Sequence, residues 1–173
     1  MRKRERGSTL LEFVLVGIPL VFLLISTVEI SRGMWHYHTL AHAVRRATRF
    51  AMVKGQGCTV GANTCVVSIA RIAQEIRSGG IGLDPDAFTN ITFKAVAGRT
   101  ITHNTLTDCL LDTTQWPTAA GSVDPGAAAG ADIEISAVYP FRSAIAMFWP
   151  GAGRGTRFGT FYFPASSRES IQF

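Results

Sequence analysis

The chain has 173 residues, of which 47% are hydrophobic and only 17% are charged, and its formal net charge is +5. Charged residues are scarcer than the quarter that is usual in soluble domains. Most of the positive charge falls in the first seven positions, so the remainder is nearly balanced and lacks the basic surface typical of nucleic-acid binding. Composition therefore favours a membrane protein and excludes a nucleic-acid-binding one.

The longest apolar segment covers residues 10–28. At about 1.5 Å per residue a helix of this length spans roughly 28 Å, close to the hydrocarbon core of a bilayer. Basic residues before such a helix stay on the cytoplasmic side, which predicts that everything after Val28 is exported. Only five positions in this segment are not large and apolar: Glu12, Gly17, Pro19, Ser26 and Thr27.

After the apolar segment the helix is predicted to continue to about Val53, because no proline and no pair of glycines interrupts it before Gly55. Residues 8–29 form its transmembrane half and residues 30–54 its amphipathic half. The amphipathic half has an apolar stripe with steps of three and four residues. Its members are Ile30, Met34, Tyr37, Ala41, Val44, Thr48 and Ala51.

Residues 55–173 are predicted to form an extracytoplasmic α+β head. A short second helix is expected from about Val66 to Arg77, capped by Asn63 or Thr64 and stopped by two glycines at 79–80. Alternating apolar residues predict strands at 91–97, 133–139 and 158–163, forming a small antiparallel sheet. The threonine-rich segment 100–118 and the small-residue segment "DPGAAAGA" carry no strong structural signal.

Three cysteines fall in the predicted head. An exported location permits one disulfide, and we expect it between Cys58 and Cys65, which bracket a short loop. Cys109 remains an alternative partner for either. The C-x6-C spacing is not a zinc pattern, and no second pair completes a site.

No set of residues predicts catalysis, a metal or a cofactor. The glycine-rich stretch "WPGAGRGTRFG" lacks the lysine of a phosphate-binding loop and favours a loop between strands. Among His36, His38 and His42, only the last two share a helix face, and no nearby carboxylate or cysteine obviously completes a ligand set. We therefore expect a protein that is not an enzyme, and we assign these histidines no role.

The stretch "ERGSTLLEF" resembles the class III leader of type IV pilins and pseudopilins: a short basic leader, a glycine, then a glutamate before the apolar run. In that family, prepilin peptidase cuts after the glycine. The resemblance implies a leader at residues 1–7, cleavage between Gly7 and Ser8, and Glu12 as the fifth mature residue. The apolar helix is kept, unlike in an ordinary secretory signal.

The first 53 residues are also similar to the TadE-like family of the tight adherence (Tad, Flp) pilus system. The shared features are Glu12-Phe13, a proline in the apolar run, Glu29 with Arg32, and a segment from Arg45 to Arg49-Phe50-Ala51. The later "VYPFR" (138–142) is similar to a family strand, whereas the C-terminal "PASSRES" is not obviously family-like.

The resemblance implies a minor pilin or pseudopilin in the bacterial inner membrane, with a cytoplasmic N-terminus and a periplasmic head. Its partners would be prepilin peptidase, other pilins packed through the helix, and the assembly platform. A carboxylate in lipid must find a partner or be protonated, and pilins use the α-amino group of a neighbouring subunit for this.

Three alternatives remain open. Glu12 could instead snorkel to the membrane interface. Glu29 and Arg32, three residues apart at the membrane exit, form a local helical pair on the simplest interpretation. The alternative for the whole chain is a plain single-pass membrane protein that keeps its leader and binds a periplasmic ligand through its head.

Overall fold

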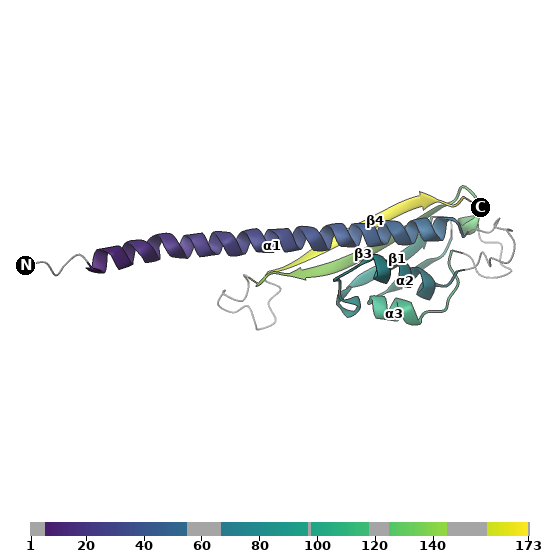
Figure 1. The fold of residues 1–173 in the computed structure, drawn as a ribbon. Coiled ribbons are helices and arrows are strands. Elements are labelled where there is room, and N and C mark those ends of the chain that lie inside the picture. Colours follow the sequence, from purple (N-terminus) through teal and green to yellow (C-terminus); the bar gives the residue numbers. More distant parts are fainter. Residues whose placement is uncertain (1–5, 55–66, 97, 118–124, 145–158, 173) are drawn as a thin grey trace, which may run out of the picture. The chain divides into compact units, whose positions relative to one another are not determined.

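The computed structural model describes residues 6–54, 67–96, 98–117, 125–144 and 159–172, with residues 6–9 described through their backbone. The fold is α+β, as predicted: a long N-terminal helix, short helices and a four-stranded antiparallel sheet. In chain order the elements are α1 (Arg6–Met52), α2 (Ile69–Gly79), β1 (Asn90–Ala95), β2 (Thr100–His103), α3 (Leu106–Leu111), β3 (Asp132–Arg142) and β4 (Thr160–Ser170) (Figure 1).

The chain forms two compact units. The first comprises Met1–Met34 with Arg142–Thr160, and the second comprises Trp35–Phe141 with Phe161–Phe173. The predicted boundaries of the leader, the membrane half and the amphipathic half are defined by peptidase cleavage and by the position of a bilayer. The structure tests neither, so this division stays a prediction.

The first unit contains the N-terminal part of α1. This helix runs without a break from Arg6 to Met52 and continues through Pro19, which confirms the predicted helix of residues 8–53. Among the described residues it is the one helix long and apolar enough to cross a membrane. Its large apolar side chains are exposed to the surroundings; Leu10, Phe13 and Val28 are 68%, 76% and 65% exposed. This exposure on all sides fits a lipid environment.

The second unit buries the C-terminal part of α1 against α2 and the sheet. Val44, Thr48 and Ala51 of the predicted stripe are buried, but Ile30, Met34 and Tyr37 are exposed, so the first part of that prediction is wrong. Steps of three and four residues also fit a neighbouring face of the helix, and that face is the one that is covered. The buried residues of this face are Leu40, Ala43, Val44, Ala47, Thr48 and Ala51.

Helix α2 begins at Ile69, later than the predicted Val66, and Val66 and its predicted caps lie outside the described residues. Ser68 is the N-cap, and its hydroxyl accepts a hydrogen bond from the Arg71 amide at 3.4 Å. Ser68 has an extended backbone and forms an isolated bridge with Gln115, and the Trp116 amide donates to the Val67 carbonyl at 3.0 Å.

The predicted glycine stop of α2 is confirmed, because the helix ends at Gly79 with Gly80 as its C-cap. A Cβ atom on Gly79 would lie 3.1 Å from the Cα atom of Ala43. The two helices therefore approach closely at this point, and the absence of a side chain allows it.

The sheet has the strand order β2-β1-β3-β4. Strand β1 pairs antiparallel with β2, with Ile91 opposite His103, and antiparallel with β3, with Ala95 opposite Ile133. Alternate residues of β1 and β3 point into the core, which gives both strands a period of two.

Several strand predictions are corrected in their bounds. The first strand ends at Ala95 rather than at residue 97, and β3 extends to Arg142. The last strand begins at Thr160 and continues to Ser170 through the segment "PASSRES" (Phe158 is outside the described residues). Strand β2 and helix α3 lie in the threonine-rich segment for which no element was predicted.

Candidate functional site

The segment that carries the pilin resemblance lies at the start of α1. Gly7 and Ser8 belong to the first turn of the helix, which begins at Arg6. Glu12 lies one turn further and is exposed, between the exposed side chains of Leu11 and Phe13. No hydrogen bond or ion pair joins Glu12 to another residue that the structure describes. Its carboxylate is therefore available to a group outside that part of the chain.

Glu29, the second glutamate of α1, is in the opposite situation. Its side chain is buried, and its Oε1 accepts a hydrogen bond from Arg32 Nη1 at 3.1 Å. Its Oε2 accepts the backbone N–H of Ala144 at 2.9 Å, and Arg32 Nη2 donates to the carbonyl of Arg142 at 3.4 Å. All four residues belong to the first unit. The pair thus holds the chain that follows β3, a contact that the local sequence does not reveal.

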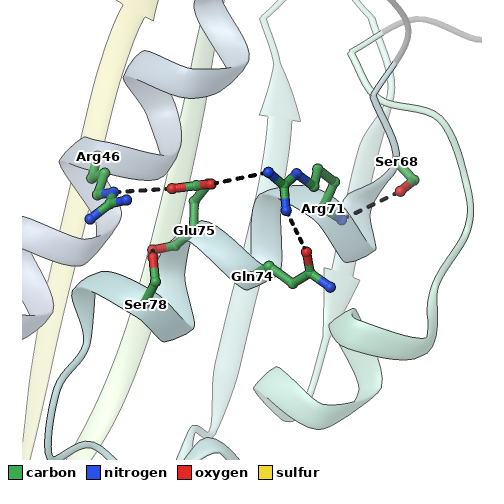
Figure 2. A network of polar contacts seen from close by, with 6 residues as sticks. All are labelled: Arg46, Ser68, Arg71, Gln74, Glu75 and Ser78. Atoms are coloured by element: carbon green, nitrogen blue, oxygen red, sulfur yellow. Dashed lines mark hydrogen bonds and ion pairs between the residues drawn. The ribbon is translucent and has the colours of Figure 1, made fainter.

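The arginines of the TadE-like segment have different surroundings. Arg45 and Arg49 are exposed, whereas Arg46 donates through Nε to Glu75 Oε2 on α2 at 3.0 Å (Figure 2). The other oxygen of Glu75 lies 3.8 Å from Arg71 Nη2. Arg46 therefore links α1 to α2 through a carboxylate that is mostly buried.

Further polar contacts extend this network along α2. Arg71 donates through Nη1 to Gln74 Oε1 at 2.8 Å, and Ser78 donates its hydroxyl to the Glu75 carbonyl at 3.1 Å (Figure 2). The guanidinium of Arg71 also lies 5.8 Å from the centre of the Phe50 ring, within cation–π range. Ala51 next to it is fully buried. Phe50 and Ala51 of the Arg-aromatic-Ala motif thus pack within the second unit, whereas its Arg49 is exposed.

The segment "VYPFR" forms the end of β3 and carries aromatic contacts. The Tyr139 hydroxyl accepts the backbone N–H of Asp84 at 3.1 Å, and its ring lies 5.2 Å from that of Phe88. The His36 ring lies 5.7 Å from the Tyr139 ring and 5.6 Å from the Phe141 ring. His36 is therefore part of an aromatic cluster between α1 and β3.

The predicted disulfide cannot be placed, because Cys58 and Cys65 lie outside the described residues. Cys109 lies on α3, is fully buried, and has no disulfide partner among the described residues. Burial first, and then the neighbouring carboxylates of Asp108 and Asp112, raise the pKa of its thiol to about 12. A thiol in this state is a poor nucleophile, which argues against a catalytic role.

Two further ion pairs of the second unit were also not predicted. His103 Nε2 lies 2.9 Å from Asp112 Oδ2, joining β2 to the end of α3. Burial on its own would raise the pKa of Asp112, but hydrogen bonds from Thr114 and His103 outweigh it and the pKa is lowered.

Asp132, at the start of β3, accepts from the Ser170 hydroxyl at 2.6 Å and from Arg168 Nη2 at 2.6 Å. These two partners, the hydroxyl first, lower its pKa. Both pairs join residues on different elements, nine and 36 positions apart, so a helix or strand pattern carries no signal for them.

No group of three or more histidine, cysteine, aspartate or glutamate residues could hold a metal ion within the described ranges. His38 and His42 lie on the exposed side of α1, and His36 points to the aromatic cluster instead. Within the part of the chain that the structure describes, the candidate site is therefore the exposed surface of α1 that carries Glu12.

Residues 7–49 match the model of a protein family described as TadE-like protein, which confirms the resemblance predicted from this segment. The match begins at Gly7, includes Glu12, Glu29 and Arg32, and ends at Arg49. No curated protein and no solved structure matches the chain.

Proposed function

From the TadE-like match at residues 7–49, we propose that the protein is a minor pilin, or pseudopilin, of a tight adherence pilus or related secretion apparatus. Prepilin peptidase removes residues 1–7 by cutting between Gly7 and Ser8. The mature subunit then acts in assembly, as an initiating or tip subunit, and performs no catalysis. In this role the N-terminal helix packs against the N-terminal helices of other subunits.

Glu12 is the observation that carries this proposal. It lies exposed among apolar side chains on a helix long enough to span a membrane, and no described residue of the chain compensates its charge. A carboxylate in hydrocarbon costs several kcal/mol, on the order of 3 kcal/mol on insertion scales, unless it is paired or protonated. A partner group on another subunit removes this cost only in the assembled state. The carboxylate of Glu12 therefore favours the assembled state over the isolated subunit in the membrane.

The proposed partner is the α-amino group that cleavage creates on Ser8 of a neighbouring subunit. Before cleavage this nitrogen is a neutral amide, so an uncut subunit offers no cation at this position. Processing therefore precedes assembly, because the cut supplies the charge that Glu12 requires. Glu12 also sets the register between neighbouring helices, since a displaced neighbour would leave its carboxylate unpaired.

The membrane orientation follows from the charges that flank the apolar segment. The leader carries four basic residues against one acidic residue, which places it in the cytoplasm of a bacterial cell and the head in the periplasm. The peptidase and the assembly platform would meet the protein in the inner membrane, and the head would become extracellular if the subunit enters a pilus.

The test uses Glu12→Ala and Glu12→Gln in cells that contain the prepilin peptidase and the assembly proteins. The N-terminus of the protein is read by mass spectrometry, and assembly is read by crosslinking of the subunit into pili. Val14→Ala is the matched control, because it truncates an exposed side chain in the same turn without removing a charge.

We expect both Glu12 variants to reduce assembly strongly and the control to assemble normally. Normal cleavage together with normal assembly of Glu12→Ala would refute the role of this carboxylate. A protein that keeps its leader in the presence of the peptidase would instead support the plain single-pass anchor.

A further inference from the structure

A line of basic side chains follows the exposed side of α1 within the second unit. Its members are spaced four, three and four residues apart: His38, His42, Arg45 and Arg49. At about 100° per residue these positions lie within about 60° of one another, along about 16 Å of the helix. They therefore form one face of the helix, which we call the basic stripe.

The basic stripe points away from the core of its own unit. The buried residues on the opposite side of α1 are Leu40, Ala43 and Ala47. All members of the stripe are exposed, and no ion pair joins them to an acidic side chain that the structure describes. The neighbouring Arg46, by contrast, is paired with Glu75 of α2. The stripe is thus a cationic helix face without a counter-charge in the described part of the chain.

Three carboxylates gather on other elements of the same unit. Asp84 and Asp86 belong to the short 3-10 turn at Pro85–Ala87, and Asp108 lies in the first turn of α3. The Thr107 hydroxyl donates to Asp86 Oδ1 and so joins the turn to α3. We call these three carboxylates the acidic surface.

The acidic surface is exposed and keeps its negative charge. Asp84 accepts the backbone N–H of Asp86 at 3.1 Å, and Asp108 accepts the backbone N–H of Thr105 at 3.2 Å. Within the described ranges, no ion pair joins any of the three carboxylates to a basic side chain. Their local hydrogen bonds fix the side chains in position without neutralising them.

Helix α2 separates the acidic surface from the basic stripe. Its Glu75 binds Arg46 of α1, and the amide of Ala70 donates to the Asp112 carbonyl at the end of α3 at 2.8 Å. Figure 1 accordingly shows α2 between α1 and α3. The two charged surfaces therefore belong to different sides of one unit and can meet only between copies of the chain.

This distribution of charge favours one kind of contact between copies. Two basic stripes repel each other, so a symmetric pairing of these helix faces is disfavoured. A basic stripe set against the acidic surface of another copy is attractive, and such a contact uses a different patch on each partner. Contacts of this kind repeat from copy to copy and give open filaments unless they close into a ring.

We propose that the basic stripe binds the acidic surface of a second copy of this chain. The second copy is the chosen occupant because the chain carries its own complementary surface. Outside the first seven residues its charge is nearly balanced, unlike that of a nucleic-acid-binding domain. The proposal rests on the assembly role proposed above, and it does not depend on cleavage at Gly7.

The test reads contacts between full-length chains that are reconstituted together in liposomes. The photo-crosslinking residue p-benzoylphenylalanine is introduced at His42, within the stripe, and mass spectrometry identifies the peptides to which it crosslinks. Ser166 of β4 is the matched control position, because it is exposed and belongs to neither surface. We expect position 42 to crosslink to the acidic surface of another copy, and position 166 to give no such product.

Arg45→Glu should lower the yield of this crosslink about fivefold, because an attractive contact becomes a repulsive one. Lys94→Glu is the matched control, since it reverses one exposed charge on the face of β1 that points away from the core, and it should leave the yield unchanged. Asp86→Lys should also lower the yield, and its combination with Arg45→Glu should restore it. Asp86→Asn keeps an acceptor for the Thr107 hydroxyl and should lower the yield even if Asp86→Lys does not fold.

No crosslink between copies at position 42, or equal yields from Arg45→Glu and the unsubstituted chain, would overturn the proposal. A crosslink that depends on Arg45 but maps to lipid or to another part of the chain would also overturn it, because the stripe would then have a different occupant. Failure of the pilin function would instead be seen as an intact leader in cells with the peptidase, so the two failures can be distinguished.

Discussion

Replacing Glu29 should release the chain after β3 from α1, and the structure allows the size of the effect to be estimated. Glu29 accepts the Ala144 N–H at 2.9 Å and a hydrogen bond from Arg32 at 3.1 Å. A hydrogen bond to a charged group contributes about 1.5–3 kcal/mol. The Arg32 side chain is 48% exposed, so its pair with Glu29 adds only about 0–1 kcal/mol.

Glu29→Ala removes the acceptor of the Ala144 amide. The expected loss of about 1.5–3 kcal/mol corresponds to roughly 10- to 100-fold faster hydrogen exchange at that amide. Glu29→Gln keeps a neutral acceptor of the same length and should lose only about 1 kcal/mol, an exchange about fivefold faster. The assay is amide-resolved hydrogen exchange of the full chain in a nanodisc.

The amide of Gly80 is the internal control, because it donates to the Ile76 carbonyl at 2.8 Å in the second unit. Its exchange should be unchanged in both Glu29 variants. Equal exchange of the Ala144 amide in the unsubstituted protein and in Glu29→Ala would refute the holding role. Faster exchange at Gly80 as well would indicate general unfolding rather than a local release.

Three further predictions concern the head. Ile76→Ala in the core should lower the free energy of unfolding by about 2–5 kcal/mol, whereas Ile81→Ala, at a 72% exposed position, should change it by less than about 0.5 kcal/mol in the same denaturant titration. The lowered pKa of Asp132 means that its stabilising effect is present above the unfolded pKa of about 3.9 and is lost as the pH falls through the lower folded value, so Asp132→Asn should flatten the acid dependence of stability. Cys109, with its pKa raised to about 12, should react with iodoacetamide at pH 8 much more slowly in the folded protein than in urea, as peptide mass spectrometry would detect.

Helix α1 could be predicted because its signals are local. The apolar run, the basic flank and the lack of a proline between Pro19 and Gly55 all lie within one continuous segment. The buried face of its C-terminal part was predicted less well. Apolar residues at steps of three and four occur on two adjacent faces of this helix, so the sequence pattern does not distinguish between them. Which of them is covered depends on α2 and the sheet, which lie later in the chain.

The missed elements of the head have identifiable physical reasons. Helix α3 has only six residues, too few for a periodic pattern, although its capping box of Thr105 and Asp108 was readable. A strand was predicted at residues 158–163, but its continuation to Ser170 was missed, because Pro164 and the polar residues after it oppose a strand prediction. It is an edge strand, where a proline costs no ladder hydrogen bond if its nitrogen faces outward.

The candidate site was predictable only in part. Gly7 and Glu12 lie in a compact motif that the family match includes, whereas removal of residues 1–7 stays a prediction. The contact between Glu29 and Ala144 joins residues 115 positions apart, and the link between Arg46 and Glu75 joins two helices. Such contacts arise from tertiary packing, so the sequence alone paired Glu29 with Arg32 but could not predict Ala144 or the partner of Arg46.

Mass spectrometry of the N-terminus of the protein, purified from cells with and without the prepilin peptidase, tests the central claim most directly. The account predicts a chain that begins at Ser8 when the peptidase is present and keeps residues 1–7 when it is absent. Gly7→Leu should keep the leader in both cases, because a bulky side chain would replace the glycine before the cut bond. An intact leader in cells with an active peptidase would contradict the account.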